Sequence, residues 1–173
     1  MMRFNVLTLR PDFSDLQVAV PARCWAQGGH HTNWCPDSRH LLMNLGHFGL
    51  PLRLCRVAYD GSGLAPIIDT PFGSGHPTLH PDGRHILTDS YTNEKPFARE
   101  DGSVPLRWID THTRTETEIA RLPSRPPQED VALRIDPHPA WDRAHRRIAV
   151  NALIDGTRAV LVADLSELLR SGG

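Results

Sequence analysis

A motif that occurs three times, at intervals of 45 and 62 residues, constrains the fold of this chain more than any other feature. It reads HTNWCPDSRHLL at residues 31–42, HPTLHPDGRHIL at 76–87 and HPAWDRAHRRIA at 138–149, and the copies align without a gap. Repeats of this length are typical of solenoids and propellers. Every copy begins with a histidine; these equivalent residues are His31, His76 and His138.

Each repeat is predicted to form four antiparallel strands. The first begins at the histidine, and a polar turn leads into an apolar second strand. Third strands are predicted at 52–59 and 106–110, and fourth strands at 64–68 and 116–122. The other predicted strands are 4–9, 16–21, 147–152 and 159–164. Four antiparallel strands per repeat describe a propeller blade, so the predicted fold class is an all-β, partial β-propeller of about three blades.

The repeats divide the chain into segments of one propeller domain. Residues 1–27 are predicted to be the last strands of an incomplete blade, 28–72 and 73–123 to be blades, and 124–173 a further incomplete blade. Propellers close with about 4–8 blades, and we expect this chain to be part of a seven-bladed one. Unpaired strand edges favour aggregation. Two ways to cover them therefore stay open: a missing N-terminal half, or self-association with another copy.

Composition excludes several classes of partner. The formal net charge of -1 gives no basic surface for nucleic acid or an anionic membrane. No apolar run approaches the roughly 20 residues that span a bilayer, and the N-terminus lacks a secretory signal, so we expect a cytoplasmic protein. Cys24, Cys35 and Cys55 form no C-x-x-C pair, which favours reduced thiols.

The repeated histidines are the candidate functional residues. In up-and-down strand order the long loops share one face, and the first strands line the central channel, so the three imidazoles should point toward one axis. Asn44, Asp89 and Asn151 end the second strands and add polar groups on that side. Converging imidazoles can bind a divalent metal, or one can act as a general base. An equally weighted alternative is that each histidine is structural and hydrogen-bonds a neighbouring loop.

Other repeated residues are assigned structural roles. Trp34 and Trp141 are predicted to pack in the core between blades. The aspartates of the hairpin turns are predicted to be turn formers. His40 and His85, which leave these turns at matching positions, are predicted to be solvated.

The segments GGHHTNWCPD, GSGHPTLHPDGRHILTDSY and IDPHPAW resemble the oligogalacturonate lyase family, propeller enzymes that degrade pectin fragments. The resemblance runs from residue 28 to about residue 165. It implies a metal-assisted β-elimination of 4-linked uronate oligosaccharides, with manganese as the cofactor and an acidic oligosaccharide as the partner. It also implies that His31 is the catalytic base and that His76 and His138 are metal ligands.

The last family motif, Gln-x-x-His-Pro-His, is altered here. The corresponding residues are Leu133, Asp136 and His138. Asp136 can still bind a hard divalent cation, whereas Leu133 cannot. Two of the four ligands that the resemblance implies are therefore changed.

The family's substrate-binding arginine has no counterpart that the motifs identify. Arg10, Arg53 and Arg107 are candidates by location, and we predict that Arg53 and Arg107 bind substrate together with Asn44 and Asp89. Two alternatives to a lyase stay open. One is a non-catalytic propeller module that binds a protein or a sugar on the same face, and the other is an inactive fragment of a larger propeller.

Overall fold

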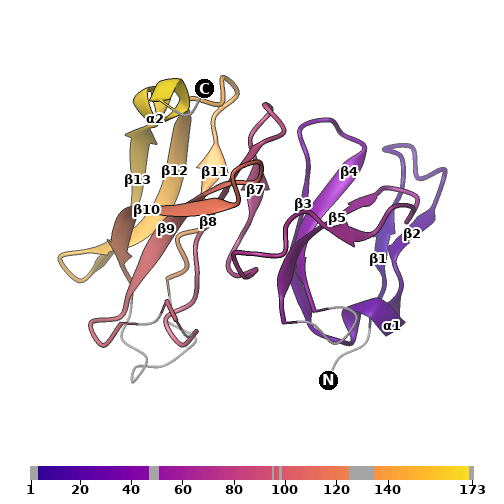
Figure 1. The fold of residues 1–173 in the computed structure, drawn as a ribbon, viewed down its shortest axis with the longest axis horizontal. Helices are drawn as coiled ribbons and strands as arrows, with labels where there is room; N and C mark the ends of the chain where they lie inside the picture. Colours follow the sequence, from indigo (N-terminus) through magenta and orange to yellow (C-terminus); the bar gives the residue numbers. More distant parts are fainter. Residues whose placement is uncertain (1–3, 47–50, 95, 98, 125–134, 172–173) are drawn as a thin grey trace. The chain divides into compact units, whose positions relative to one another are not determined.

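The computed structural model describes residues 4–46, 51–94, 96–97, 99–124 and 135–171. Its strands form four sheets, and the two described helices, α1 (Ala22–Trp25) and α2 (Ser166–Ser171), are short (Figure 1). No helix among these residues is long and apolar enough to cross a membrane. The predicted all-β class is confirmed.

The chain forms two compact units, and each is described by itself. The first comprises residues 1–86 and 109–115, and the second comprises residues 87–108 and 116–173.

The first unit begins with a two-stranded antiparallel sheet, β1 (Val6–Thr8) and β2 (Gln17–Val20), followed by α1. A four-stranded antiparallel meander comes next, in the order β3 (Gly29–Trp34), β4 (His40–Leu45), β5 (Arg53–Ala58) and β6 (Ala65–Pro66). Trp34 lies opposite Leu41 in the β3–β4 hairpin.

Strand β4 is buried on both faces, because its successive side chains point to opposite sides of the sheet and each side packs in an apolar core. Leu41, Met43 and Leu45 of β4 belong to one apolar core, whereas Leu42 belongs to another. The first core contains Ala19, Val20, Cys24, Trp25, Leu41, Met43, Leu45, Cys55 and Val57. The second contains Cys35, Leu42, Leu54, Ile68, Leu79, Ile86 and Ile109. A strand with two apolar faces is suited to a blade that packs between two neighbours.

Two further sheets complete the described strands. One has the order β10 (Thr115–Pro123), β9 (Ser103–Asp110), β8 (His85–Thr88) and β7 (Thr78–Leu79). The other has the order β11 (Ala140–Trp141), β12 (Arg147–Ile154) and β13 (Thr157–Asp164). Trp141 lies opposite Ile148, the same register as Trp34 opposite Leu41, so the first and third repeats form equivalent hairpins.

The core of the second unit bears out one tryptophan prediction. Trp141 packs against this core, and its ring centroid lies 6.2 Å from that of Trp108 in an edge-on arrangement. The core residues are Leu87, Leu106, Trp108, Leu122, Ile148 and Val150.

The prediction of a core position for Trp34 is wrong, because its side chain is 48% exposed. Trp34 ends β3 and lines an open cavity beside the β1–β2 turn.

Candidate histidine site

His31 and His76 lie side by side in the first unit. Their ring centroids are 3.9 Å apart, and one ligand nitrogen of each ring lies within 4.8 Å of the other. His76 is only 5% exposed, whereas His31 is half-buried. Zinc–imidazole bonds are about 2.1 Å long. Two rings this close could therefore serve one divalent ion, either as two ligands or as a ligand and a neighbouring base.

A β-bulge positions His31. The register of the β3–β4 pair shifts between His30 and Asn33, so the chain has extra length opposite β4. His31 itself has a φ of 55°, in the left-handed region that residues other than glycine seldom enter. Bulges redirect side chains and are frequent beside active sites. This one lies where the His31 ring meets the ring of His76.

Asn44 holds the segment that leads into His76. Its side chain is fully buried at the end of β4, and its Nδ2 donates a hydrogen bond of 2.7 Å to the backbone oxygen of Gly75. The same Nδ2 lies 3.4 Å from Nδ1 of His30. The prediction that Asn44 binds substrate stays a prediction; the described hydrogen bond of its side chain holds the backbone of Gly75, next to His76.

Gly73 is required for this arrangement. A Cβ at that position would lie 2.7 Å from Oδ1 of Asn44 and 2.8 Å from the backbone carbon of Arg53. Both distances are too short for any side chain. The absence of a side chain at Gly73 therefore lets the loop pack directly on the ends of β4 and β5.

Asp89 plays the corresponding part in the second unit. Its carboxylate is fully buried and accepts a hydrogen bond of 2.9 Å from the backbone N–H of His138. His138 is exposed and has a φ of 48°, which is left-handed like its repeat equivalent His31. Asp89 was predicted to bind substrate, and the structure shows it holding the backbone of His138.

Asn151, the third of these equivalent residues, lies within β12, so the prediction that it ends its strand is wrong. Its Nδ2 donates to the backbone oxygen of Asp136 at 3.2 Å, and its backbone N–H donates to that of Pro137 at 2.8 Å. Asp136 is half-buried, two residues before His138. Leu133, the other altered position of this motif, lies outside the described residues.

The two predicted substrate arginines differ in their surroundings. The guanidinium of Arg53 is half-buried, lies 5.0 Å from the ring centroid of Phe72 and donates to the backbone oxygen of Leu52 at 3.2 Å. Arg107 is fully buried and makes two hydrogen bonds to the carboxylate of Glu116, of 2.9 and 2.8 Å. This ion pair holds Arg107 in the interior of the second unit. Arg53 is therefore the more accessible of the two arginines that were predicted to bind substrate.

The cysteines are unsuited to metal binding. All three are free and buried. Burial raises the pKa of the Cys35 thiol and of the Cys55 thiol to about 11. The thiolate is the metal-binding form, so burial disfavours Cys35 and Cys55 as ligands.

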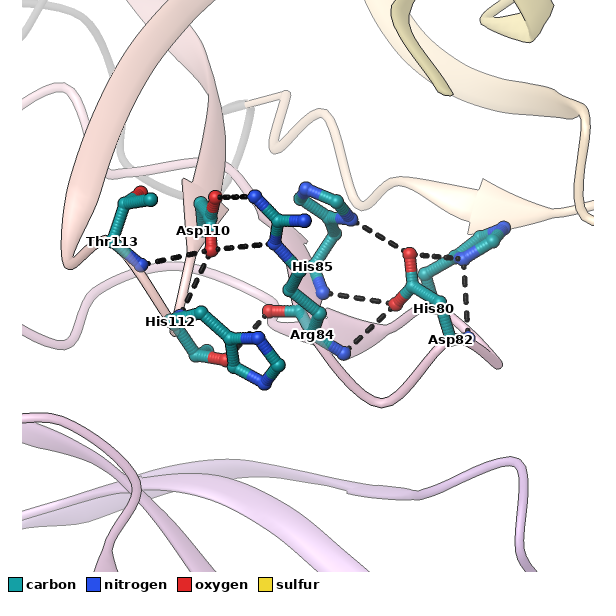
Figure 2. Close-up of polar contacts among 8 residues, drawn as sticks. His80, Asp82, Arg84, His85, Asp110, His112 and Thr113 are labelled. Atoms are coloured by element: carbon teal, nitrogen blue, oxygen red, sulfur yellow. Dashed lines mark hydrogen bonds and ion pairs between the residues drawn. The ribbon is translucent and has the colours of Figure 1, made fainter. Parts of the chain in front are cut away.

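The hairpin turn of the second repeat contains a polar cluster that sequence reasoning missed (Figure 2). The carboxylate of Asp82 accepts hydrogen bonds from the backbone N–H groups of Arg84 and His85, at 2.8 and 3.0 Å, and lies 2.7 Å from Nδ1 of His85. His85 is 5% exposed, so its predicted solvation is wrong. The spacing Asp-x-x-His, present at the same position of the first two repeats, is the signal that could have identified this pair.

Acid should weaken this turn. Burial raises the pKa of the Asp82 carboxyl, but the hydrogen bonds from His85 and from the backbone outweigh burial and lower that pKa from 3.8 to about 2. A carboxyl whose folded pKa is lowered stabilises the fold above about pH 4, and this contribution disappears as the pH falls toward 2. Asp82→Asn should lower the free energy of unfolding by about 1 kcal/mol at pH 7, and by progressively less between pH 4 and pH 2. Urea unfolding at several pH values measures this, and a difference that does not change with pH would contradict it.

No protein-family model matches the chain. No curated protein matches it either. Solved structures do match. TolB from Acinetobacter baumannii has a TM-score of 0.64 and 14% sequence identity, over 92% of this chain and 35% of TolB. An oligogalacturonate lyase in complex with manganese has a TM-score of 0.64 and 18% identity, over 95% of this chain and 42% of the lyase.

These likenesses establish the fold. The chain is a part-length β-propeller. It spans between a third and a half of the length of these two propellers. At such low identity the likeness extends to the fold alone, so the chemistry has to be argued from the residues of this propeller chain itself.

Proposed function

We propose that this propeller chain is oligogalacturonate lyase-like and that it cleaves 4-linked uronate oligosaccharides by β-elimination with a divalent metal, namely manganese. The juxtaposition of His31 and His76 carries the proposal, since it places a candidate base beside a candidate metal ligand. His138 is their repeat equivalent and would be the third member of the group. The lyase that shares this fold was solved in complex with manganese.

The roles follow from burial and chemistry. His76, which is buried, and His138 would hold the metal, together with a carboxylate oxygen of Asp136. When bound, the metal would neutralise the uronate carboxylate and so acidify the neighbouring C5 proton. An unprotonated nitrogen of His31 would accept that proton. The C5–H electron pair would then form the C4=C5 double bond, and the glycosidic oxygen would leave from C4. Arg53 would bind a carboxylate of the substrate.

Metal content and product formation, measured together, test these roles separately. His76→Ala should lose stoichiometric manganese, because it removes a ligand. His31→Ala should keep the metal but form unsaturated uronate about 10²–10⁴-fold more slowly, since that is the usual contribution of a general base. His112→Ala, which removes an exposed imidazole on a turn, is the matched control and should change neither quantity.

Two outcomes would overturn the proposal in different ways. Loss of metal from His31→Ala would make His31 a ligand and leave the reaction without its assigned base. A parent protein that binds no metal, even after incubation with excess manganese, would remove the lyase mechanism altogether.

The second candidate function is that of a non-catalytic sugar-binding module. It is favoured by the altered last motif, in which Leu133 and Asp136 stand where the resemblance implies two metal ligands. Binding of an acidic oligosaccharide without any unsaturated product, in protein that contains manganese, would select this alternative.

A further inference from the structure

We propose that the first unit carries a second binding site, away from the histidines, for a uronate residue of an acidic sugar. A cavity of about 900 Å³ opens beside the β1–β2 turn and the β3–β4 hairpin. It is lined by two aromatic side chains, Trp34 and Tyr59, and by Arg10, Arg39 and Asp15. The described residues of one unit form it entirely.

The aromatic residues supply flat apolar surfaces. Trp34 is 48% exposed and Tyr59 is 38% exposed, although large aromatic side chains are usually buried. The equivalent of Trp34 in the second repeat, Leu79, is only 7% exposed. The first repeat therefore places a larger ring at this position and leaves it uncovered, which suits stacking on the apolar face of a sugar ring.

In the other two repeats an arginine after the hairpin turn has a carboxylate partner. Arg84 makes two hydrogen bonds to Asp110, of 2.9 and 2.6 Å, as Figure 2 shows. In the third repeat the Nε of Arg147, one residue after the position equivalent to Arg39, lies 3.4 Å from the Oδ2 of Asp164. Both aspartates end the third strand of their sheet.

The first repeat lacks this carboxylate. Ala58 ends β5 and lies opposite His40, as Asp164 lies opposite Arg147 in the third repeat. The guanidinium of Arg39 consequently makes no ion pair with any residue that the structure describes. An arginine without its usual partner, at the wall of an open cavity, is available to an anionic ligand.

The charge of the cavity sets the ligand class. Arg10 pairs with Asp15 at 3.3 Å, so this carboxylate offsets one of the two guanidinium groups and an excess of one positive charge remains at Arg39. A uronate carries a single carboxylate, which a guanidinium can bind through two hydrogen bonds, on a ring that can stack on Trp34 or Tyr59. The choice of a uronate over other ring-shaped anions rests on the proposed function.

Restoring the carboxylate tests the site. Ala58→Asp should pair with Arg39, as Asp110 pairs with Arg84, and should weaken binding of tri-galacturonate at least tenfold. Trp34→Leu, which introduces the residue of the second repeat, should weaken it similarly. Arg143→Ala removes one exposed arginine from the other unit and should leave the affinity unchanged. The titrations are made by calorimetry on protein freed of metal with EDTA, and circular dichroism confirms that each variant is folded.

These titrations distinguish binding in the cavity from binding at the histidine site. Binding that persists in metal-free His76→Ala supports a second site even if the lyase mechanism fails. No binding to the metal-free parent, or equal affinity of the parent and Ala58→Asp, would overturn the proposal. Equal affinity for a neutral galactose trimer would exclude the role of Arg39, and tighter binding of AMP would exclude a sugar as the ligand.

Discussion

Replacing Glu116 with alanine is expected to lower the free energy of unfolding by about 1–3 kcal/mol, because a buried guanidinium loses two hydrogen bonds while the Glu116 side chain is itself 25% exposed. Arg107, the partner of Glu116, is fully buried, and its guanidinium also lies 4.2 Å from the ring centroid of Phe97. Glu116→Ala would remove the two hydrogen bonds from the buried Arg107 guanidinium to the Glu116 carboxylate. Urea unfolding followed by circular dichroism gives the change in free energy.

Glu118 provides the matched control, because it lies two residues along the same strand and also pairs with an arginine. The side chains of Arg121 and Glu118 are 23% and 45% exposed, so Glu118→Ala should cost less than about 1 kcal/mol. The double variant Arg107→Met, Glu116→Leu should recover most of the stability, since no buried charge remains. Equal losses for Glu116→Ala and Glu118→Ala would show that water reaches the Arg107 guanidinium.

Asn44→Ala is expected to reduce manganese affinity about 10–100-fold, although Asn44 is not assigned as a ligand. Side chains that position metal ligands usually have effects of this size. The variant would leave the backbone oxygen of Gly75 without its 2.7 Å hydrogen bond and would release the segment that carries His76. Loss of a buried hydrogen bond should also lower the free energy of unfolding by about 1–3 kcal/mol.

Asn33→Ala is the control for this prediction, because Asn33 is exposed on β3. It should affect neither metal affinity nor stability. Asn44→Asp separates positioning from packing, because a carboxylate of the same shape cannot donate to the Gly75 oxygen. If Asn44→Asp binds manganese as the parent does, the hydrogen bond does not position His76.

Local chemistry made the strands predictable. Hairpin turns and the alternation of side chains along a strand depend on residues that are neighbours in the sequence. The repeat alignment therefore predicted that Trp34 and Trp141 occupy the same register. The structure also brings His31 beside His76, as their equivalence in the repeat suggests. The roles assigned to these histidines stay predictions until metal content and product formation are measured.

Contacts between distant segments were less predictable. The sequence shows Trp34 as a repeated aromatic residue, but its exposure depends on whether another segment covers it. Asn44 and Asp89 were correctly recognised as equivalent, yet their partners, Gly75 and His138, lie 31 and 49 residues further along the chain. No local pattern distinguishes a polar side chain that holds backbone from one that binds a ligand.

The left-handed backbone at His31 and His138 has a consequence for how substitutions at these positions should be judged. For a residue with a Cβ this conformation costs roughly 1–2 kcal/mol, whereas glycine adopts it freely. The backbone alone would therefore favour glycine at both positions. Each histidine lowers the stability of the folded backbone relative to glycine. A screen for higher stability would therefore select glycine at His31 and His138. The resulting protein would lose the two imidazoles on which the proposed reaction depends.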